Sequence, residues 1–349
     1  MRTAIKVAIV GASGYAGEEL VRLLLGHPQA DLVAVTSRQY AGQSLAQIFP
    51  RFSHYPKAKD LRFTDPNSES LAKEAETVFL ALPHGVAADY AKPLLQLGAW
   101  VIDLSADFRL KDAAVYKEFY GHEHPAPELL ARSVYGLPEI YREKIRNSHF
   151  IACPGCYPTS ILLPTLPLLH AKVIEANSII ADSLSGVTGA GRKVEADYLF
   201  AECNESLRPY GIPKHRHLSE LEQELSLAAG KSVVMQFTPH LVPVNRGILT
   251  TLYLQPVLQD TSGLDQNIAE VYQSAYANEP FVRLLQGKAL PDTKNVVGTN
   301  FIEIGWRVDP RTGRLIVMSA EDNIVKGTSG QAIQCFNIMN GFPEMAGLI

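Results

Sequence analysis

The stretch VAIVGASGYAGEEL, residues 7–20, decides the fold of this chain. Its apolar first part is typical of a buried strand, and its last part begins a helix. Between them lie Gly11, Gly14 and Gly17, spaced G-x-x-G-x-x-G, so that the early glycine is displaced by one from the usual G-x-G-x-x-G. Glycines allow a tight turn there, and the first N–H groups of a helix can bind a pyrophosphate. The stretch predicts a dinucleotide-binding unit; a plain strand-to-helix turn without a ligand is the alternative.

Outward from this stretch, short apolar strands alternate with helical segments. Strands are predicted at Ile5–Val10, Leu32–Thr36, Thr77–Leu82 and Trp100–Leu104, with a helix near Ala87–Leu97. Nearly all-apolar strands that alternate with helices are typical of a parallel sheet covered on both faces. We therefore predict an α/β fold with a Rossmann-type doubly wound parallel sheet in the first part of the chain.

The second part of the chain has longer, β-rich segments. They are Val233–Thr238, Gly247–Leu254, Phe301–Val308 and Leu315–Ser319, the last two joined by the hairpin signal DPRTGR. We expect an α+β catalytic domain with a mixed or antiparallel sheet. The predicted domains are 1–152, which binds NADP and is completed by a C-terminal helix within about 320–349, and 153–319, for catalysis, substrate and oligomerisation.

Bulk properties exclude several classes of protein. The chain has 349 residues, 46% hydrophobic and 19% charged, with a formal net charge of −4 and no basic block. Nucleic acid and anionic membranes are therefore not expected as partners. The apolar N-terminal run is short and leads into glycines, which favours a strand over a signal peptide. Four cysteines make no disulfide framework, so we expect reduced thiols and a cytoplasmic location.

The end of the second strand indicates which dinucleotide is bound. It reads AVTSRQ, with Thr36, Ser37 and Arg38 where an acidic residue would hold the ribose of NAD. Hydroxyl and guanidinium groups suit a 2′-phosphate, so NADP is predicted. His84 follows a strand at the carboxyl edge of the sheet, where ligands bind. The residues expected in the glycine loop are Gly11, Ser13, Gly14, Tyr15, Ala16 and Gly17.

The segment IACPGCYPTS, residues 151–160, contains two cysteines in the spacing C-x-x-C. A redox pair and half of a zinc site are both possible; zinc needs about four ligands, and no second C-x-x-C exists, so we predict no metal. A single nucleophile explains more residues. A strand ends near Ala152, Pro154–Gly155 turns the chain, and an apolar helix follows. Cys156 then lies at a helix start, whose positive end favours the thiolate.

A thiolate beside a nicotinamide-binding domain suggests reduction of an activated acyl group through a thioester, with a histidine to move protons. His215, His217 and His240 compete for that role. On an extended segment His215 and His217 would face the same way, with a helix beginning just after them. A histidine at a helix start has a lowered pKa, which suits a neutral imidazole that accepts a proton.

Six motifs together resemble the N-acetyl-gamma-glutamyl-phosphate reductase family, whose wider relatives include aspartate-semialdehyde dehydrogenase and glyceraldehyde-3-phosphate dehydrogenase. They are VGASGYAG, DLSADFRL, CPGCYPTS, SGVTGAGR, KHRHLSE and PHLVPVNRG, and the matches run from Val7 to about Gly330, nearly the whole chain. The resemblance implies NADPH-dependent reduction of N-acetyl-glutamyl 5-phosphate to the semialdehyde in arginine biosynthesis. It also implies a homo-oligomer, a homotetramer or a homodimer.

The resemblance also implies roles for individual residues. Cys156 resembles the family nucleophile and His217 its acid/base. Ser185 lies where the relatives orient the substrate, and Arg109 where they hold phosphate. Gly189 and Asn323 are assigned to the cofactor site. From residue chemistry alone, Arg109, Arg192 and Arg246 are candidate clamps for a substrate with two anionic ends.

Other functions remain open at this point. A related reductase of a carrier-linked aminoadipyl phosphate in lysine biosynthesis shares most of these motifs. A non-catalytic NADP-binding sensor would keep the fold without the chemistry, although intact Cys156 and His217 argue against it. A cysteine hydrolase would not need the glycine loop.

Overall fold

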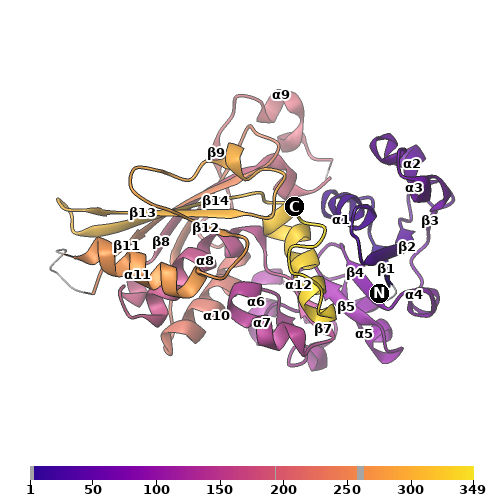
Figure 1. Ribbon diagram of the computed structural model, residues 1–349, viewed down its shortest axis with the longest axis horizontal. Helices are drawn as coiled ribbons and strands as arrows, with labels where there is room; N and C mark the ends of the chain where they lie inside the picture. The colour runs from indigo at the N-terminus through magenta and orange to yellow at the C-terminus, as the bar shows by residue number, and fades with distance from the viewer. Residues whose placement is uncertain (1–3, 193, 258–262) are drawn as a thin grey trace. The chain divides into compact units, whose positions relative to one another are not determined.

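The computed structural model of the chain describes residues 4–192, 194–257 and 263–349. The chain divides into two compact units, Met1–Pro154 with Thr328–Ile349, and Gly155–Gly327 (Figure 1). The sequence prediction places residues 320–327 in the first domain, whereas they lie in the second unit. The reason is that the last strand of the second sheet runs to Glu321, and the Asp322 carboxylate accepts the N–H of Gly298 at 2.7 Å.

The first unit contains a parallel sheet of seven strands in the order β3-β2-β1-β4-β5-β7-β6. The strands are β1 (Ile5–Val10), β2 (Ala30–Thr36), β3 (Phe63–Thr64), β4 (Thr77–Leu80), β5 (Trp100–Asp103), β6 (Val134–Tyr135) and β7 (Phe150–Ala152). Every pairing between them is parallel. The predicted doubly wound parallel sheet is therefore confirmed.

Helices accompany this sheet along the chain. They are α1 (Tyr15–Leu25), α2 (Leu45–Ile48), α3 (Pro56–Asp60), α4 (Ser68–Glu74), α5 (Ala88–Gln96), α6 (Ala113–Tyr120), α7 (Pro138–Arg146) and α12 (Gly330–Asn340). The C-terminal helix α12 packs against α7 and α1. The Gln331 side chain donates to the carbonyl of Gly136 at 3.2 Å, so the chain end is part of this unit's core.

The second unit contains a mixed sheet of seven strands in the order β12-β13-β14-β11-β8-β10-β9. The strands are β8 (Ile180–Gly186), β9 (Arg208–Pro209), β10 (Gln236–Val242), β11 (Ile248–Leu254), β12 (Val282–Leu285), β13 (Ile302–Asp309) and β14 (Arg314–Glu321). The helices are α8 (Cys156–His170), α9 (Phe200–Cys203), α10 (His217–Ala229) and α11 (Leu264–Tyr276). Strands β13 and β14 form the hairpin predicted from DPRTGR.

Helix α8 is the central helix of the second unit and contains two internal prolines, Pro164 and Pro167. A proline has no N–H, so the carbonyl four residues earlier loses its helical donor. The hydroxyl of Ser319 donates to the carbonyl of Ser160 at 2.6 Å, and the hydroxyl of Tyr276 donates to that of Leu163. Both carbonyls left by the prolines are thus satisfied by the surrounding sheet and helix, which fixes α8 in its place.

None of the helices in the described ranges is long and apolar enough to cross a bilayer.

Candidate active site

Cys156 is the first residue of α8, as the sequence predicts. Strand β7 ends at Ala152, Pro154 and Gly155 turn the chain, and Gly155 is the N-cap residue with extended backbone angles of −70° and 160°. Cys156 is partly exposed, whereas Cys153 is buried, with 1% of its surface accessible. The positive end of a helix favours a thiolate, so the position of Cys156 suits a nucleophile, and buried Cys153 has a packing role.

The peptide before Cys156 is held on both sides. The Gly155 N–H donates to Oε1 of Glu220 at 2.9 Å. The Gly155 carbonyl accepts from the N–H and from the hydroxyl of Thr159, each at 3.1 Å. The turn that presents the sulfur is therefore fixed by its own helix and by α10.

The histidine motif is built differently from the extended segment that the sequence suggests. Helix α10 begins at His217 itself, and Nδ1 of His215 accepts the His217 N–H at 3.1 Å. A helix start has N–H groups without intrahelical acceptors, and His215 supplies one acceptor. Burial first, and the neighbouring charge of Arg216 second, lower the pKa of His215 to about 4. His215 is therefore a neutral residue that accepts the first N–H of α10.

His240 belongs to the opposite side of the second sheet. Side chains alternate along a strand, and in β10 the buried residues Phe237 and Leu241 are out of phase with half-buried His240. The Phe237 ring lies 5.2 Å from Tyr157 in α8, so its face carries the cysteine helix. His240 therefore points away from that helix.

The ring of Tyr157, the residue after Cys156, lies close to the rings of both His215 and His217. The Tyr157 ring lies 5.7 Å from that of His215 and 5.9 Å from that of His217. The Tyr157 hydroxyl lies 2.8 Å from the hydroxyl of Tyr210. Burial is the largest cause that raises the pKa of both phenols, with the Cys156 thiolate a further cause. Both tyrosines therefore act as neutral hydrogen-bonding groups.

The chain also passes very close to Cys156 at Gly327. A Cβ atom added at Gly327 would lie 2.7 Å from Cβ of Cys156 and 2.9 Å from Oε1 of Glu321. Glu321 is fully buried. Only glycine fits at this position, so the end of β14 and the segment after it form one wall beside Cys156.

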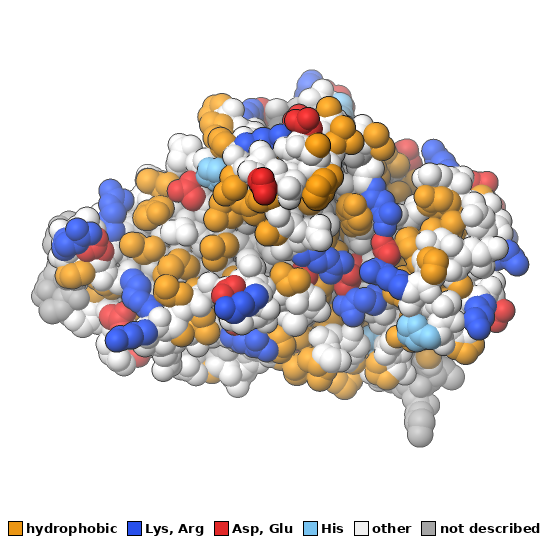
Figure 2. Space-filling model, turned by 90° about the horizontal axis from the view of Figure 1, so that it is seen from above, with side chains coloured by type: hydrophobic (Ala, Val, Ile, Leu, Met, Phe, Trp, Pro, Cys, Tyr) orange, Lys and Arg blue, Asp and Glu red, His pale blue; other side chains and the backbone are white. Residues whose placement is uncertain are grey.

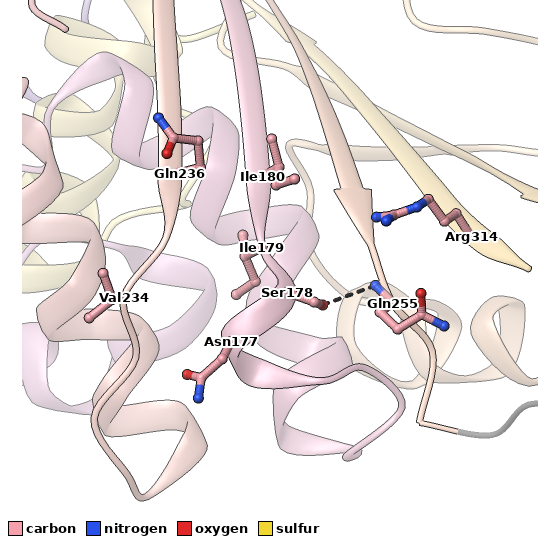
Figure 3. A pocket seen from close by; sticks show the side chains of 8 residues that line it. All are labelled: Asn177, Ser178, Ile179, Ile180, Val234, Gln236, Gln255 and Arg314. Carbon is pink, nitrogen blue, oxygen red and sulfur yellow. Dashed lines mark hydrogen bonds between the residues drawn. The ribbon is translucent and has the colours of Figure 1, made fainter. Parts of the chain in front are cut away.

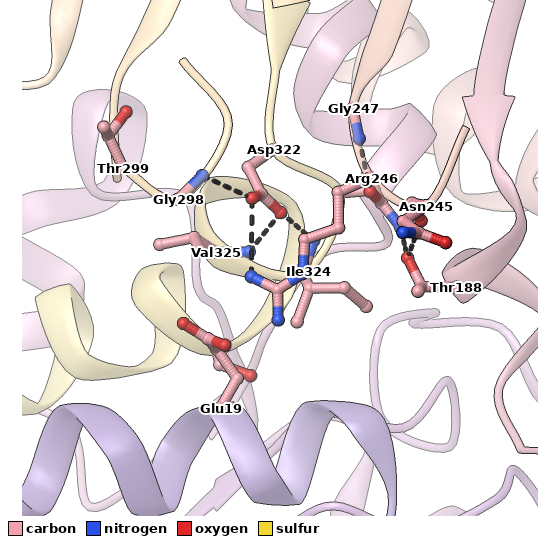
Figure 4. Close-up of polar contacts among 12 residues, drawn as sticks. Glu19, Thr188, Asn245, Arg246, Gly247, Gly298, Thr299, Asp322, Ile324 and Val325 are labelled. Carbon is pink, nitrogen blue, oxygen red and sulfur yellow. Dashed lines mark hydrogen bonds and ion pairs between the residues drawn. The ribbon is translucent and has the colours of Figure 1, made fainter. Parts of the chain in front are cut away.

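Asp322 organises the region around Arg246 (Figure 4). Its buried carboxylate accepts the N–H groups of Gly298, Ile324 and Val325 at 2.7, 2.7 and 3.1 Å. Its Oδ2 lies 3.6 Å from a guanidinium nitrogen of Arg246, whose side chain is 25% exposed. Arg246 thus forms an ion pair with a buried carboxylate while part of its side chain stays exposed.

Three further residues predicted for the site gather near this region. The Asn323 side chain accepts the Gly247 N–H at 2.8 Å and donates to the Thr188 hydroxyl at 3.0 Å. A Cβ at Gly189 would lie 3.3 Å from the Ser185 hydroxyl and 3.7 Å from Nδ2 of Asn323. Ser185, Gly189 and Asn323 therefore lie together, whereas Arg192 is exposed on the stretch beyond them.

In the first unit the glycine loop has the shape that a pyrophosphate needs. Gly11 has φ +83°, and a Cβ there would lie 2.4 Å from the Ala81 carbonyl oxygen. A Cβ at Gly17 would lie 2.3 Å from the Gly11 oxygen, so this glycine allows helix and strand to pack closely. At Gly14, the N-cap of α1, the nearest atom would be 3.7 Å away, which leaves room for a phosphate beside Tyr15 and Ala16.

The predicted 2′-phosphate residues lie at the end of β2. The Gly11 N–H donates to the Thr36 hydroxyl at 3.3 Å, and the hydroxyls of Ser13 and Ser37 lie 2.9 Å apart. Arg38 is exposed, and its guanidinium donates to the Tyr90 hydroxyl at 3.0 Å. These groups fit NADP: the glycine loop would hold its pyrophosphate, and Ser37 and Arg38 its 2′-phosphate.

Asp107 links the loop that carries His84 to the motif DLSADFRL. Its carboxylate accepts the N–H groups of Gly85 and Ala88 at 2.6 and 3.2 Å. His84 itself is exposed, with its ring 5.5 Å from that of Tyr120. Arg109 is 7% exposed and donates to the carbonyls of Cys153 and Leu104 at 2.7 and 2.9 Å. It therefore supports the chain just before the cysteine turn.

Sequence reasoning did not identify three residues that hold the site in place, namely Tyr157, Glu220 and Asp322. Glu220 lies three residues after His217, a spacing that puts both on one side of a helix, and this signal was available. Tyr157 directly follows the nucleophile. The role of Asp322 depends on contacts with residues 24 and 76 positions away, which no local pattern reveals.

Comparison with known proteins agrees with this geometry. Residues 6–148 match the family described as semialdehyde dehydrogenase, NAD binding domain, and residues 156–323 match semialdehyde dehydrogenase, dimerisation domain. Aspartate semialdehyde dehydrogenase II of Vibrio cholerae, complexed with ASA, superposes with a TM-score of 0.73 at 17% identity, covering 97% of this chain and 99% of that one. The Candida albicans enzyme with NADP gives 0.72 at 15% identity, with the same coverage. These structures share the fold.

Sequence relatives are much closer. The N-acetyl-gamma-glutamyl-phosphate reductase of Akkermansia muciniphila is 56% identical over 346 residues, 99% of this chain and 98% of its own length. The reductase of Geotalea daltonii is 49% identical with the same coverage. Identity of this extent over the full length, together with the thiol and histidine at adjoining helix starts, shows that the chain belongs to the N-acetyl-gamma-glutamyl-phosphate reductase family.

Proposed function

We propose that this chain reduces N-acetyl-glutamyl 5-phosphate to N-acetyl-glutamate 5-semialdehyde with NADPH and releases phosphate, the step in arginine biosynthesis for which its relatives are named. The observation that carries the proposal is the position of Cys156 as the first residue of α8, on a turn whose Gly155 N–H is bound to Glu220 in α10. A nucleophile and a candidate acid/base thus stand at the starts of two packed helices.

Cys156 performs the first step as a thiolate. Its sulfur attacks the acyl carbon of the substrate, a C–S bond forms, and the bond from that carbon to the phosphate oxygen breaks. Phosphate leaves with its electron pair, so a thioester remains on Cys156. The helix start stabilises the thiolate before attack, and the absence of a side chain at Gly327 leaves room for the side chain of Cys156.

When bound, NADPH supplies a hydride to the thioester carbon. His217 then handles the proton at the former carbonyl oxygen: its imidazole donates a proton as the thiohemiacetal forms and takes it back as the C–S bond breaks. The aldehyde is released and the thiolate is restored. His215, fixed as an acceptor for the His217 N–H, keeps the His217 backbone at the helix start.

The substrate has two anionic ends, an acyl phosphate and an α-carboxylate. Arg246, held by Asp322 yet partly exposed, supports binding of one of them. Ser185 and Arg192 remain candidates for the same substrate, and Gly189, Asn323 and His84 for the cofactor. Arg109, with its bonds to the carbonyls of Leu104 and Cys153, supports the turn in addition to its proposed phosphate contact.

Substitution of the nucleophile tests the function. Cys156→Ser should abolish phosphate-dependent reduction of NADP with the semialdehyde as substrate, because a hydroxyl at this position is not ionised. Cys203→Ser is the matched control, since Cys203 is also partly exposed but lies in α9. Cys156→Ser activity within a few-fold of the parent would contradict the covalent role.

A second experiment identifies the substrate. Turnover of the free acetylated acyl phosphate is compared with turnover of a carrier-linked aminoadipyl phosphate under the same conditions. We expect a strong preference for the free substrate, and mass spectrometry of the acid-quenched enzyme should show the acyl adduct on the Cys156 peptide. A preference for the carrier-linked substrate would assign the chain to lysine biosynthesis instead.

We also propose that the protein is a homo-oligomer, either a homodimer or a homotetramer built from such dimers. Residues 156–323 match a dimerisation domain, and helix α8 covers only one face of the second sheet. On the other face Tyr253 lies opposite Ile180 on one neighbouring strand and Ile316 on the other. Three partly exposed apolar side chains therefore form a row across β8, β11 and β14. A second copy of this chain is the occupant that we assign to this face.

Other surface features support the same proposal. A pocket of about 350 Å³ at one end of the open face is lined by the starts of β8, β10 and β14, including Ile180, Gln236 and Arg314 (Figure 3). Around α9, Val194 and Phe200 are 97% and 79% exposed. Figure 2, seen from above, shows hydrophobic side chains exposed among charged ones. Tyr253→Lys should lower the molecular weight in sedimentation velocity; an unchanged weight would exclude this face.

We place the protein in the cytoplasm. All four cysteines are free thiols, and the proposed reaction requires Cys156 to remain reduced.

A further inference from the structure

The carboxylate of Glu220 connects the two helices that carry the reactive groups. Glu220 lies in the first turn of α10, three residues after His217, and is 1% exposed. Its Oε1 accepts the N–H of Gly155, the residue directly before Cys156, at 2.9 Å. A single buried side chain thus joins the start of the histidine helix to the start of the cysteine helix.

The chemistry of the contact makes it a rigid one. Leaving a buried N–H without an acceptor is costly, so the Gly155 N–H stays bound to Oε1 of Glu220. Helix α8 is anchored by the hydroxyls of Ser319 and Tyr276, which donate to its carbonyls, and His215 accepts the first N–H of α10. Glu220 therefore restricts the movement of the turn at Gly155 relative to α10.

We propose that Glu220 is a positioning residue that sets the distance between the Cys156 sulfur and the His217 imidazole by holding the Gly155 N–H. This inference rests on the proposed function. The side chain acts through the backbone of its neighbour, so its function depends on an acceptor atom at Oε1 more than on a negative charge.

The variants Glu220→Gln and Glu220→Met separate these two properties. Glutamine keeps an oxygen acceptor of the same reach, whereas methionine fills the space without one. Because a misplacement of about 1 Å can cost about 100-fold in rate, Glu220→Met should lower kcat by about that factor with KM changed little. Glu220→Gln should keep kcat within a few-fold of the parent.

Glu224 provides the matched control. It lies one turn further along α10, is 2% exposed, and its Oε1 accepts from the Gln223 side chain at 2.9 Å. Glu224→Gln and Glu224→Met place the same changes in an equally buried site away from the cysteine turn. They should leave kcat near that of the parent, and their melting temperatures measure the cost of the substitution to folding.

Hydrogen exchange tests the contact without any substrate. The proteins are labelled with ¹⁵N-glycine so that the Gly155 amide can be followed. This amide should exchange slowly in the parent and in Glu220→Gln. In Glu220→Met it should exchange at least about 10-fold faster, since the amide loses its acceptor. If the amide behaves so but the parent does not reduce the substrate, the contact stands and the proposed function fails. Equal loss of kcat in Glu220→Gln and Glu220→Met, or no loss in Glu220→Met, would overturn the positioning role.

Discussion

Nδ1 of His215 accepts the backbone N–H of His217 at 3.1 Å, so the first histidine of this short motif caps the helix that the second one begins. Burial first, and the charge of Arg216 second, lower the pKa of His215 to about 4 and keep it neutral. His217 is the first residue of α10 and lies beside the Tyr157 ring. The first histidine shapes the helix start, and the second is the one that we propose to transfer protons.

Replacement of His217 tests this division. General acid–base groups contribute about 100- to 10,000-fold, so His217→Asn should lose activity by a factor in that range. His240→Asn should stay within a few-fold, because His240 faces the other side of β10. Steady-state kcat of both variants is the measurement. A large loss in His240→Asn with little loss in His217→Asn would reverse the assignment.

The buried His215 also predicts how stability depends on pH. Its pKa falls from 6.5 in the unfolded chain to about 4 in the folded one. Between these values the unfolded chain binds more protons, so stability is full above pH 6.5 and is lost as pH falls toward 4. The slope approaches about 1.4 kcal/mol per pH unit. Urea unfolding of parent and His215→Gln from pH 7 to 4.5 measures it, and the variant should lose this slope; identical slopes would contradict the prediction.

Local patterns predicted much of the fold. The glycines between an apolar run and a helix specify β1, its turn and α1, because these contacts join residues close in the sequence. The position of Cys156 at a helix start could be predicted for the same reason, since Pro154 and Gly155 turn the chain just before an apolar helix. The two interacting features are within a few residues of each other in each case.

Contacts between distant segments could not be predicted. Glu220 and Gly155 are 65 residues apart, and Asp322 meets Arg246 only because β11 and β14 pair in a register that brings Ile248 opposite Glu321. Arg109 shows the same limit. Its residue type suggests an anion ligand, and only the folded chain shows that the guanidinium is also buried and donates to the backbone carbonyl of Cys153.

The close approach at Gly327 predicts a loss of activity from the smallest possible substitution. In Gly327→Ala the new methyl group would lie 2.7 Å from Cβ of Cys156, so one of the two segments must move. Overpacking of this kind costs about 1–3 kcal/mol, and a shift of the nucleophile should lower kcat by about 100-fold. Gly26→Ala is the control, because the nearest atom to its Cβ is 3.7 Å away. Full activity in Gly327→Ala would show that the segment that carries Gly327 can move without displacing Cys156.

Arg38 predicts the choice between NADPH and NADH. A guanidinium at the end of β2 has no phosphate to bind in NADH, so Arg38→Leu should raise KM for NADPH and leave KM for NADH nearly unchanged. Hydrogen bonds between charged groups contribute about 1.5–3 kcal/mol, which corresponds to about 10- to 100-fold in KM. Arg62→Leu is the matched control, since Arg62 is also exposed in the first unit and donates to the Gly42 carbonyl at 2.9 Å. An equal rise in KM for both cofactors would mean that Arg38 supports the loop through Tyr90 and does not read the 2′-phosphate.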